Sequence, residues 1–181
     1  MKRRAFVGVV ATMSVVGAAC TSVPVSTMWK LARFDASDLL AIDPAELRAA
    51  VLIDTRATMR QVTMAVALTP KGGAANTFEI PIAEPTARNA PLPPPPAGRR
   101  WEVFALNASG QREFARMRET ALKMPRGSSM ALGLSAREGD VPPELMRRFP
   151  LRIEMMLDPK DGWFTLLKDT TLDLEAMAKK P

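Results

Sequence analysis

Hydrophobic and polar residues alternate along several short segments of the chain, a pattern typical of β-strands that bury one face. Residues 62–68 place hydrophobic side chains at every second position, and so do residues 78–82. Between them, Lys71-Gly72-Gly73-Ala74-Ala75-Asn76 supplies residues that tolerate positive φ. We therefore predict an antiparallel hairpin. The other face of its first strand, which includes Thr63, is expected to be solvated.

A second hairpin is predicted near the C-terminus. Residues 151–157 alternate in the same way, and the turn-forming run from Asp158 to Gly162 precedes Trp163 and Phe164. Leu172 and Leu174 are candidates to extend its second strand. With the other segments of strand character, about eight strands are expected in all; these other segments are residues 28–34, 49–54, 101–106 and 129–136.

Helical patterns are fewer. Ser109 is placed to cap a helix whose hydrophobic residues Phe114, Met117 and Ala121 recur at three and four positions. A single helical turn fits Asp43-Pro44-Ala45-Glu46, and another helix is predicted to start at Pro142-Pro143-Glu144. Strands with one main α-helix indicate a mainly β fold, either a β-sandwich or a partly open barrel.

A proline-rich loop, residues 84–100, separates the first hairpin from the next strand. Its prolines Pro93, Pro94, Pro95 and Pro96 cannot donate to a sheet ladder and favour an extended polyproline II path. One interpretation is a docking loop for an aromatic-lined groove, and the other is a solvated spacer. We favour the spacer, because proline-rich stretches serve as spacers more often than as ligands.

The first 20 residues have the layout of a secretory leader. Basic residues come first, an apolar stretch runs from Ala5 to Val16, and small residues lead to Cys20. The apolar stretch is too short and too diluted for a permanent membrane-spanning helix. The expected organisation is a signal peptide at 1–19, a lipidated tether at 20–27, a single domain at 28–176 and a tail at 177–181.

The sequence Gly17-Ala18-Ala19-Cys20 resembles the lipobox of bacterial lipoprotein precursors. The resemblance covers the leader alone and implies that Cys20 receives a lipid such as palmitate and becomes the mature N-terminus. Gly17 departs from the family pattern, which has an aliphatic residue there. Gly17 and Ala19 also satisfy the rule for ordinary signal peptidase, which would release a soluble product with a free thiol. A single cysteine at this boundary favours the lipoprotein.

The same resemblance bears on export and location. Arg3 and Arg4, followed by Ala5-Phe6-Val7, are similar to a twin-arginine export motif, although a basic pair is also ordinary in a leader read by the general pathway. Retention in the inner membrane goes with Asp after the lipidated cysteine, whereas Thr21 follows here. The resemblance therefore implies anchoring in the outer membrane of the cell envelope, facing the periplasm.

The composition of the chain excludes several classes of function. The chain of 181 residues has a net charge of +6, which falls to +3 when Lys2, Arg3 and Arg4 leave with the leader. The electrostatic field of so small a net charge is weak, and the sequence has no nucleic-acid-binding motif, so no nucleic-acid partner is expected. The chain has no histidine and one cysteine. These counts exclude the serine–histidine, cysteine–histidine and zinc hydrolase mechanisms.

Carboxylates are the acid–base groups that remain, and no pair of them is marked by the sequence. Glu79, Glu102 and Glu154 fall on polar faces of predicted strands, where we expect solvated side chains. The Asp158–Gly162 segment lacks the ligand spacing of a calcium loop and is interpreted as a turn. The adjacent Met155 and Met156 point to opposite faces of a strand, so they make no copper site. We expect no catalytic residue, metal or cofactor.

These patterns favour a lipid-anchored structural or protein-interaction module of the cell envelope, as a part of a secretion or envelope assembly with a protein partner. The alternative is a periplasm-facing carrier of a small apolar ligand or lipid, which would need a large apolar pocket. Membrane attachment through the N-terminal lipid is common to both.

Overall fold

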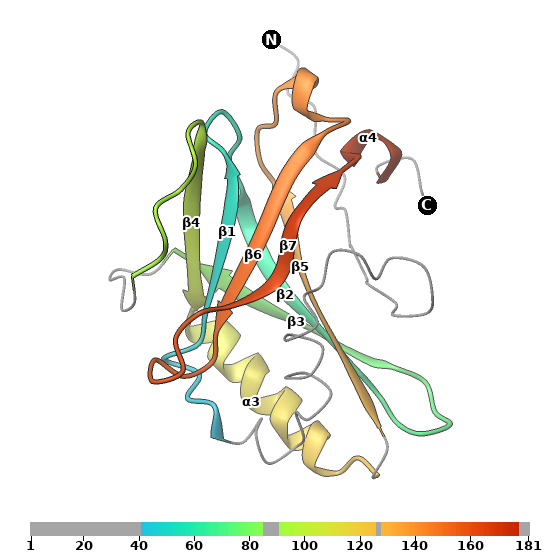
Figure 1. The fold of residues 1–181 in the computed structure, drawn as a ribbon. Helices are drawn as coiled ribbons and strands as arrows, with labels where there is room; N and C mark the ends of the chain where they lie inside the picture. Colours follow the sequence, from blue (N-terminus) through green and yellow to red (C-terminus); the bar gives the residue numbers. More distant parts are fainter. Residues whose placement is uncertain (1–40, 85–90, 126–127, 178–181) are drawn as a thin grey trace.

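A computed structural model describes residues 41–84, 91–125 and 128–177 of the chain. Within this part, seven strands form a single antiparallel sheet (Figure 1). The strands are β1 (Arg48–Asp54), β2 (Arg60–Thr69), β3 (Asn76–Ala83), β4 (Arg99–Leu106), β5 (Ser129–Glu138), β6 (Phe149–Met156) and β7 (Phe164–Leu172). The helices are α3 (Ala108–Leu122), the 3₁₀ turn η1 (Pro143–Leu145) and the short α4 (Leu174–Met177).

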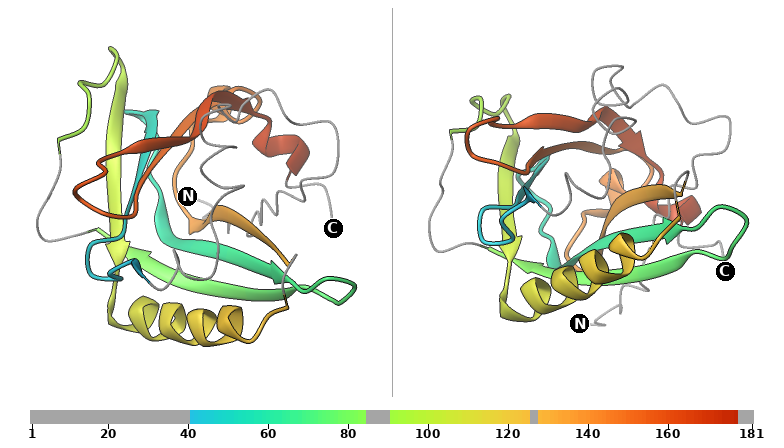
Figure 2. Two further views of the ribbon diagram at one scale, coloured as in Figure 1. Left: turned by 60° about the horizontal axis from the view of Figure 1, so that its bottom comes forward. Right: turned by 90° about the horizontal axis from the view of Figure 1, so that it is seen from below.

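The strand order across the sheet is β5-β2-β3-β4-β1-β6-β7, and the sheet curls into a half-barrel (Figure 2). The mainly β class with one main helix is confirmed. Of the two predicted architectures, the partly open barrel is the one observed, because one curled sheet takes the place of two stacked sheets. The strand predicted at residues 28–34 lies outside the described residues; each of the other predicted strands matches one of the seven.

Both predicted hairpins are confirmed. In the first, β2 pairs with β3 from Thr63 opposite Pro81 to Leu68 opposite Asn76. Its turn uses Gly72 at φ 74°, and the Gly73 amide donates to the Pro70 carbonyl over 3.0 Å. Glycine suits this turn because it adopts positive φ without steric cost.

In the second hairpin, β6 pairs with β7 across the predicted turn. The Asp158 side chain accepts a hydrogen bond from the Lys160 amide at 2.8 Å, and its carbonyl accepts one from the Asp161 amide at 3.1 Å. These bonds make the segment a turn, as predicted. The second strand extends to Leu172, whereas Leu174 begins α4.

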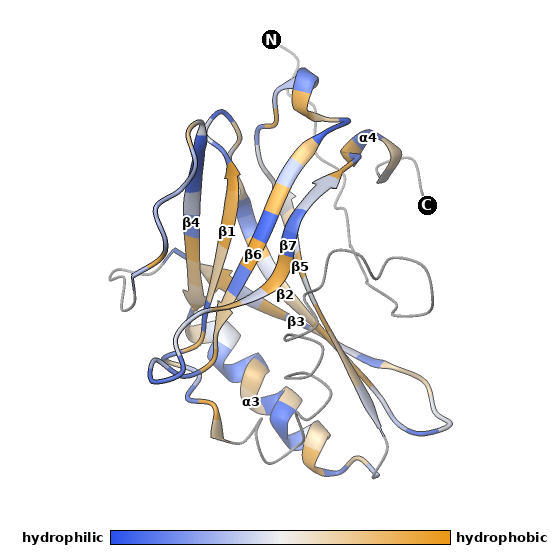
Figure 3. Ribbon diagram, viewed as in Figure 1, coloured by the Kyte–Doolittle hydropathy of each residue, from blue (hydrophilic) through white to orange (hydrophobic). Residues whose placement is uncertain are grey.

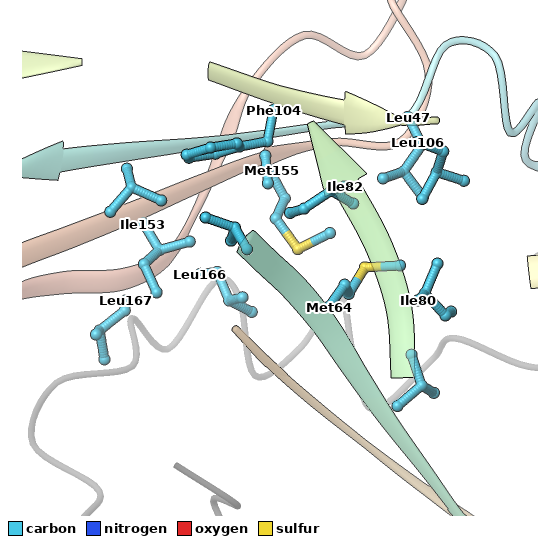
Figure 4. Packing of buried hydrophobic residues seen from close by; sticks show 14 of the residues in the cluster. Leu47, Met64, Ile80, Ile82, Phe104, Leu106, Ile153, Met155, Leu166 and Leu167 are labelled. Carbon is cyan, nitrogen blue, oxygen red and sulfur yellow. The ribbon is translucent and has the colours of Figure 1, made fainter. Parts of the chain in front are cut away.

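The hydrophobic core lies on one face of the curled sheet. Met64 and Ile80 belong to it from the first hairpin, and Phe104 and Met155 from the other half of the sheet (Figure 4). Along β6 and α3, hydrophobic residues alternate with hydrophilic ones (Figure 3). One expectation fails: Thr63 is buried rather than solvated.

Helix α3 is capped by Asn107, not by the predicted Ser109. The Asn107 side chain accepts hydrogen bonds from the Gly110 amide at 2.8 Å and from the Ser109 hydroxyl at 2.7 Å, so Ser109 lies within the first turn. The predicted residues Phe114, Met117 and Ala121 are the buried ones. The helix packs mainly against β3, and a Cβ at Gly110 would lie 2.1 Å from the Pro81 carbonyl oxygen, so only glycine fits there.

The two shorter helical predictions also correspond to local structure. Asp43 caps a single turn, since its side chain accepts from the Ala45 amide at 2.8 Å and its carbonyl accepts from the Leu47 amide at 3.2 Å. Pro143 starts the 3₁₀ turn η1 after Pro142, as proline suits the first position of a helix. The Asp43 turn precedes β1 and η1 lies between β5 and β6, and both pair backbone polar groups locally.

Candidate interaction surface

The residues singled out from the sequence fall into two groups. Cys20, Arg3 and Arg4 lie outside the described residues. Pro93, Pro94, Pro95 and Pro96 are described, and all four are exposed.

The proline segment, residues 91–96, is attached to strand β4 by hydrogen bonds to two of its carbonyl groups. The indole N–H of Trp101 donates to the Pro93 carbonyl over 2.8 Å. The Arg99 amide donates to the Pro96 carbonyl over 3.1 Å, which returns the chain into β4 through Gly98 at φ 75°. Strand β4 therefore begins at Arg99. The four prolines 93–96 are exposed, while the carbonyls of Pro93 and Pro96 accept hydrogen bonds.

Trp101 belongs to the face of the sheet opposite the core. Residues 49, 51 and 53 of β1 join the core cluster, so Ala50 and Leu52 point to the other face. The register places Leu52 between Trp101 of β4 and Arg152 of β6. We call this the outer face. Five of its polar residues on β4, β6 and β7 form one network, namely Arg99, Arg152, Glu154, Thr165 and Asp169.

Glu154 is the centre of the outer face and is 4% exposed. Its Oε1 accepts hydrogen bonds from the Arg152 Nε at 2.7 Å and from the Thr165 hydroxyl at 2.9 Å. A second nitrogen of Arg152, Nη2, lies 2.6 Å from the same oxygen. The expectation of a solvated Glu154 is wrong, because Arg152 and Thr165 replace the water that a carboxylate would otherwise need.

Asp169 joins this network through an irregularity of β7. The pairing of β6 with β7 shifts between Leu151 and Ile153, and Asp169 has φ 24° there. A bulge of this kind re-aims a side chain. The Asp169 carboxylate lies 3.5 Å from Arg99 and 3.9 Å from Arg152. Arg99 also donates to the Leu52 carbonyl over 2.8 Å, so a single arginine ties β1, β4 and β7 together.

A second pair, Arg100 and Glu102, lies on the core face of β4. Arg100 donates to the carbonyls of Thr55 at 2.6 Å and Ala57 at 2.7 Å, and to Glu102 Oε1 at 2.5 Å. The other carboxylate oxygen, Oε2, is buried and has no hydrogen-bond partner. The expectation that Glu102 is solvated is therefore wrong. Glu79 is exposed, as predicted.

A third pair joins Asp54, at the end of β1, to Arg56. The guanidinium binds the carboxylate through two bonds, Nε to Oδ1 at 2.9 Å and Nη2 to Oδ2 at 3.0 Å. The hydrogen bond from the Arg56 side chain is the main reason that the pKa of Asp54 falls from 3.8 to about 2. Arg56 also bonds Glu144 at 3.0 Å, which links the strand to η1.

The contacts on the outer face join its strands to one another. Each arginine bridges neighbouring strands, and the Trp101 bond attaches the proline segment to the same face. In the described part of the chain, no group of three or more metal-ligating side chains comes together. None of the helices between residues 41 and 177 that the structure describes is both long and apolar enough to cross a membrane.

Sequence reasoning missed this network, although a signal for it was present. Arg152 and Glu154 are two residues apart on a predicted strand, so they share a face and can bond. The same spacing recurs at Arg100 and Glu102. The contribution of Asp169 had no such signal, because it depends on the bulge.

Comparison with protein-family models, with curated proteins and with solved structures found no match to this chain.

Proposed function

We propose that the protein is a lipid-anchored structural or protein-interaction module of the bacterial cell envelope. The observation that carries the proposal is Cys20, the single cysteine of the chain, directly after the apolar leader and Gly17-Ala18-Ala19. Thr21 after the cysteine supports the outer membrane, facing the periplasm, as its location. The module belongs to a secretion or envelope assembly.

The geometry of the described domain supports an interaction role. The proline segment stays extended at the surface and is attached to the sheet through Trp101. Hydrogen bonds from Arg99 to the Leu52 carbonyl and from Thr165 to Glu154 join strands of the sheet and hold the shape of the half-barrel. A rigid sheet with an attached loop provides a constant surface to a partner, and the lipid keeps that surface close to the membrane.

The test of the anchor is the intact mass of the protein from the membrane fraction. The N-terminal peptide is expected to start at Cys20 and to carry lipid. A Cys20→Ser variant should lose the lipid and leave the membrane, whereas Gly17→Leu, which restores the aliphatic residue of the lipobox, should keep both. A soluble wild-type product with a free thiol at Cys20 contradicts the proposal.

The test of the interaction role is crosslinking in intact cells, followed by mass identification of the captured protein. We infer that the proline segment acts as a spacer, so replacing residues 91–96 by Ser and Gly at equal length should preserve the captured partner. Loss of that partner at unchanged thermal stability would instead make the segment the docking motif. Copurification of a small apolar molecule with the wild-type protein, and no captured protein, would support the carrier function.

A further inference from the structure

The two edges of the half-barrel differ in how well they are protected from pairing with another strand. Edge strands expose unpaired backbone groups, and proteins blunt them with charges, prolines or bulges. Strand β7 has two register shifts against β6 and carries Lys168 and Asp169. Strand β5 keeps a continuous register with β2 from Ala136 to Ser129 and has no charged residue or proline between those positions.

Strand β5 is also open in the described part of the chain, where its ladder partner is β2 alone (Figure 2). Its hydrophobic residues Met130, Leu132 and Leu134 face the same side as the core residues of β2, with Met130 opposite Leu68. Met130 is one of two large hydrophobic residues of the described chain that are exposed. A long, regular and uncharged edge of this kind is a template for an added strand.

The residues of β5 are symmetric in polarity about Gly133. Moving outward from Gly133 in both directions, the chain has leucine, then a small residue, then a hydrophobic residue, in the order Met130-Ala131-Leu132-Gly133-Leu134-Ser135-Ala136. An antiparallel copy centred on Gly133 would therefore set Leu132 opposite Leu134 and Ala131 opposite Ser135. Because this register pairs even positions with even ones, hydrophobic side chains stay on one face.

We propose that β5 pairs with β5 of a second copy of this chain, in antiparallel register about Gly133, and joins two half-barrels into one continuous sheet. The charges permit it, since no charged residue lies between Ser129 and Ala136. The contact is isologous, so it closes at two copies and leaves β7 as the blunted edge of each. The inference deepens the proposed interaction role by naming the partner at this edge, and it rests on that role.

The test uses two matched variants of the full chain whose monomers are altered at the same positions. Ala131→Lys/Ser135→Lys puts lysine opposite lysine twice across the proposed interface, and Ala131→Lys/Ser135→Glu puts lysine opposite glutamate. Sedimentation equilibrium in detergent is expected to show dimers for the wild type and for the Lys/Glu variant. The double-lysine variant should dissociate at least about tenfold more readily, because like charges opposite each other destabilise cross-strand pairing.

Thermal melts of both variants show whether the fold survives. If either variant fails to fold, thiol crosslinking replaces it: in a Cys20→Ser background, Ala131→Cys and Ser135→Cys copies should crosslink when mixed and far less when separate. A monomeric wild type, equal dissociation of the two folded variants, or an absence of mixed crosslinks overturns the pairing. A dimer whose Cys20 carries no lipid supports the β5 pairing and contradicts only the proposed lipid anchor. A lipidated monomer contradicts only the β5 pairing.

Discussion

The segments Arg100-Trp101-Glu102 and Arg152-Ile153-Glu154 have the same pattern of arginine and glutamate, and they lie on strands β4 and β6, which flank β1. The register places the first pair on the core face and the second on the outer face. Glu154 is bonded by an arginine and a threonine, while Glu102 leaves one buried oxygen without a partner. The same short pattern thus gives a satisfied ion pair in one place and an incompletely satisfied one in the other.

The difference follows from what the neighbouring strand offers. Thr165 of β7 lies opposite Glu154 and supplies a hydroxyl. Val51 of β1 lies opposite Glu102 and supplies none. A buried carboxylate needs donors from several sides, and an unsatisfied one lowers stability. We therefore expect the outer pair to stabilise the fold and the inner pair to contribute little.

The largest expected effect is that of Glu154→Met. It removes the partner of Arg152 from a buried site, and breaking such a pair costs roughly 3 kcal/mol of unfolding free energy. Chemical denaturation followed by circular dichroism measures the loss. The matched control is Glu79→Met on an exposed position of β3, which should change stability far less. Equal losses in the two variants would show that the Arg152 pair has no special role.

A smaller effect is expected from Thr165→Val, which keeps the shape of the side chain and removes the donor to Glu154. One hydrogen bond to a buried carboxylate is lost, so the unfolding free energy should fall by about 1 kcal/mol. Thr171→Val, at an exposed position of the same strand, serves as the control. In the Glu154→Met background the effect of Thr165→Val should shrink, because the acceptor is already gone; an unchanged effect would contradict the hydrogen bond.

Glu102→Met tests the expectation that the Arg100–Glu102 pair contributes little to stability. It removes the carboxylate oxygen that has no partner, and Arg100 keeps its bonds to the Thr55 and Ala57 carbonyls. The unfolding free energy should stay within about 1 kcal/mol of the wild type, since replacing an imperfect buried ion by an apolar side chain is often neutral. A loss as large as that of Glu154→Met would show that the two pairs are equivalent after all.

Sequence patterns predicted the local structure well, because alternation and turn residues act within one hairpin. Seven strands, both hairpins and the buried side of α3 follow from them. The burial of Glu102 and Glu154 could not be predicted in this way, since it depends on which strand lies opposite and on the curl of the sheet. The start of α3 was missed for a local reason: Asn107 and Ser109 are both good capping residues, and only Asn107 has the extended backbone that a cap requires.

In the candidate surface, too, some features follow from the local sequence and others depend on the fold. The exposure of Pro93–Pro96 could be expected from their composition, but the bond from Trp101 to Pro93 could not, since a tryptophan on a strand is more often a packing residue. The position of Asp169 depends on a bulge that no local pattern announces. The palindromic polarity of β5 is visible in the sequence, yet it has meaning only once β5 is known to lie at the margin of the sheet.

The pair of Asp54 and Arg56 gives the smallest effect, and that effect is expected to depend on pH. The pKa of Asp54 in the folded protein is about 2, below the ordinary 3.8, mainly because Arg56 donates hydrogen bonds to the charged carboxylate. A lowered folded-state pKa means that the pair stabilises the protein above the ordinary pKa and that this contribution disappears as the pH falls from about 4 to about 2.

Asp54→Asn tests this directly. The difference in urea midpoint between wild type and Asp54→Asn should be constant near neutral pH, shrink as the pH falls below about 4, and be mostly lost by pH 2, near the folded-state pKa. The difference is expected to be small, since Arg56 is half exposed and water screens the pair. Glu84→Gln, at an exposed position after β3, should show a smaller difference near neutral pH. A difference for Asp54→Asn that persists unchanged at pH 2 would show that Asn disturbs the end of β1 by another route than charge.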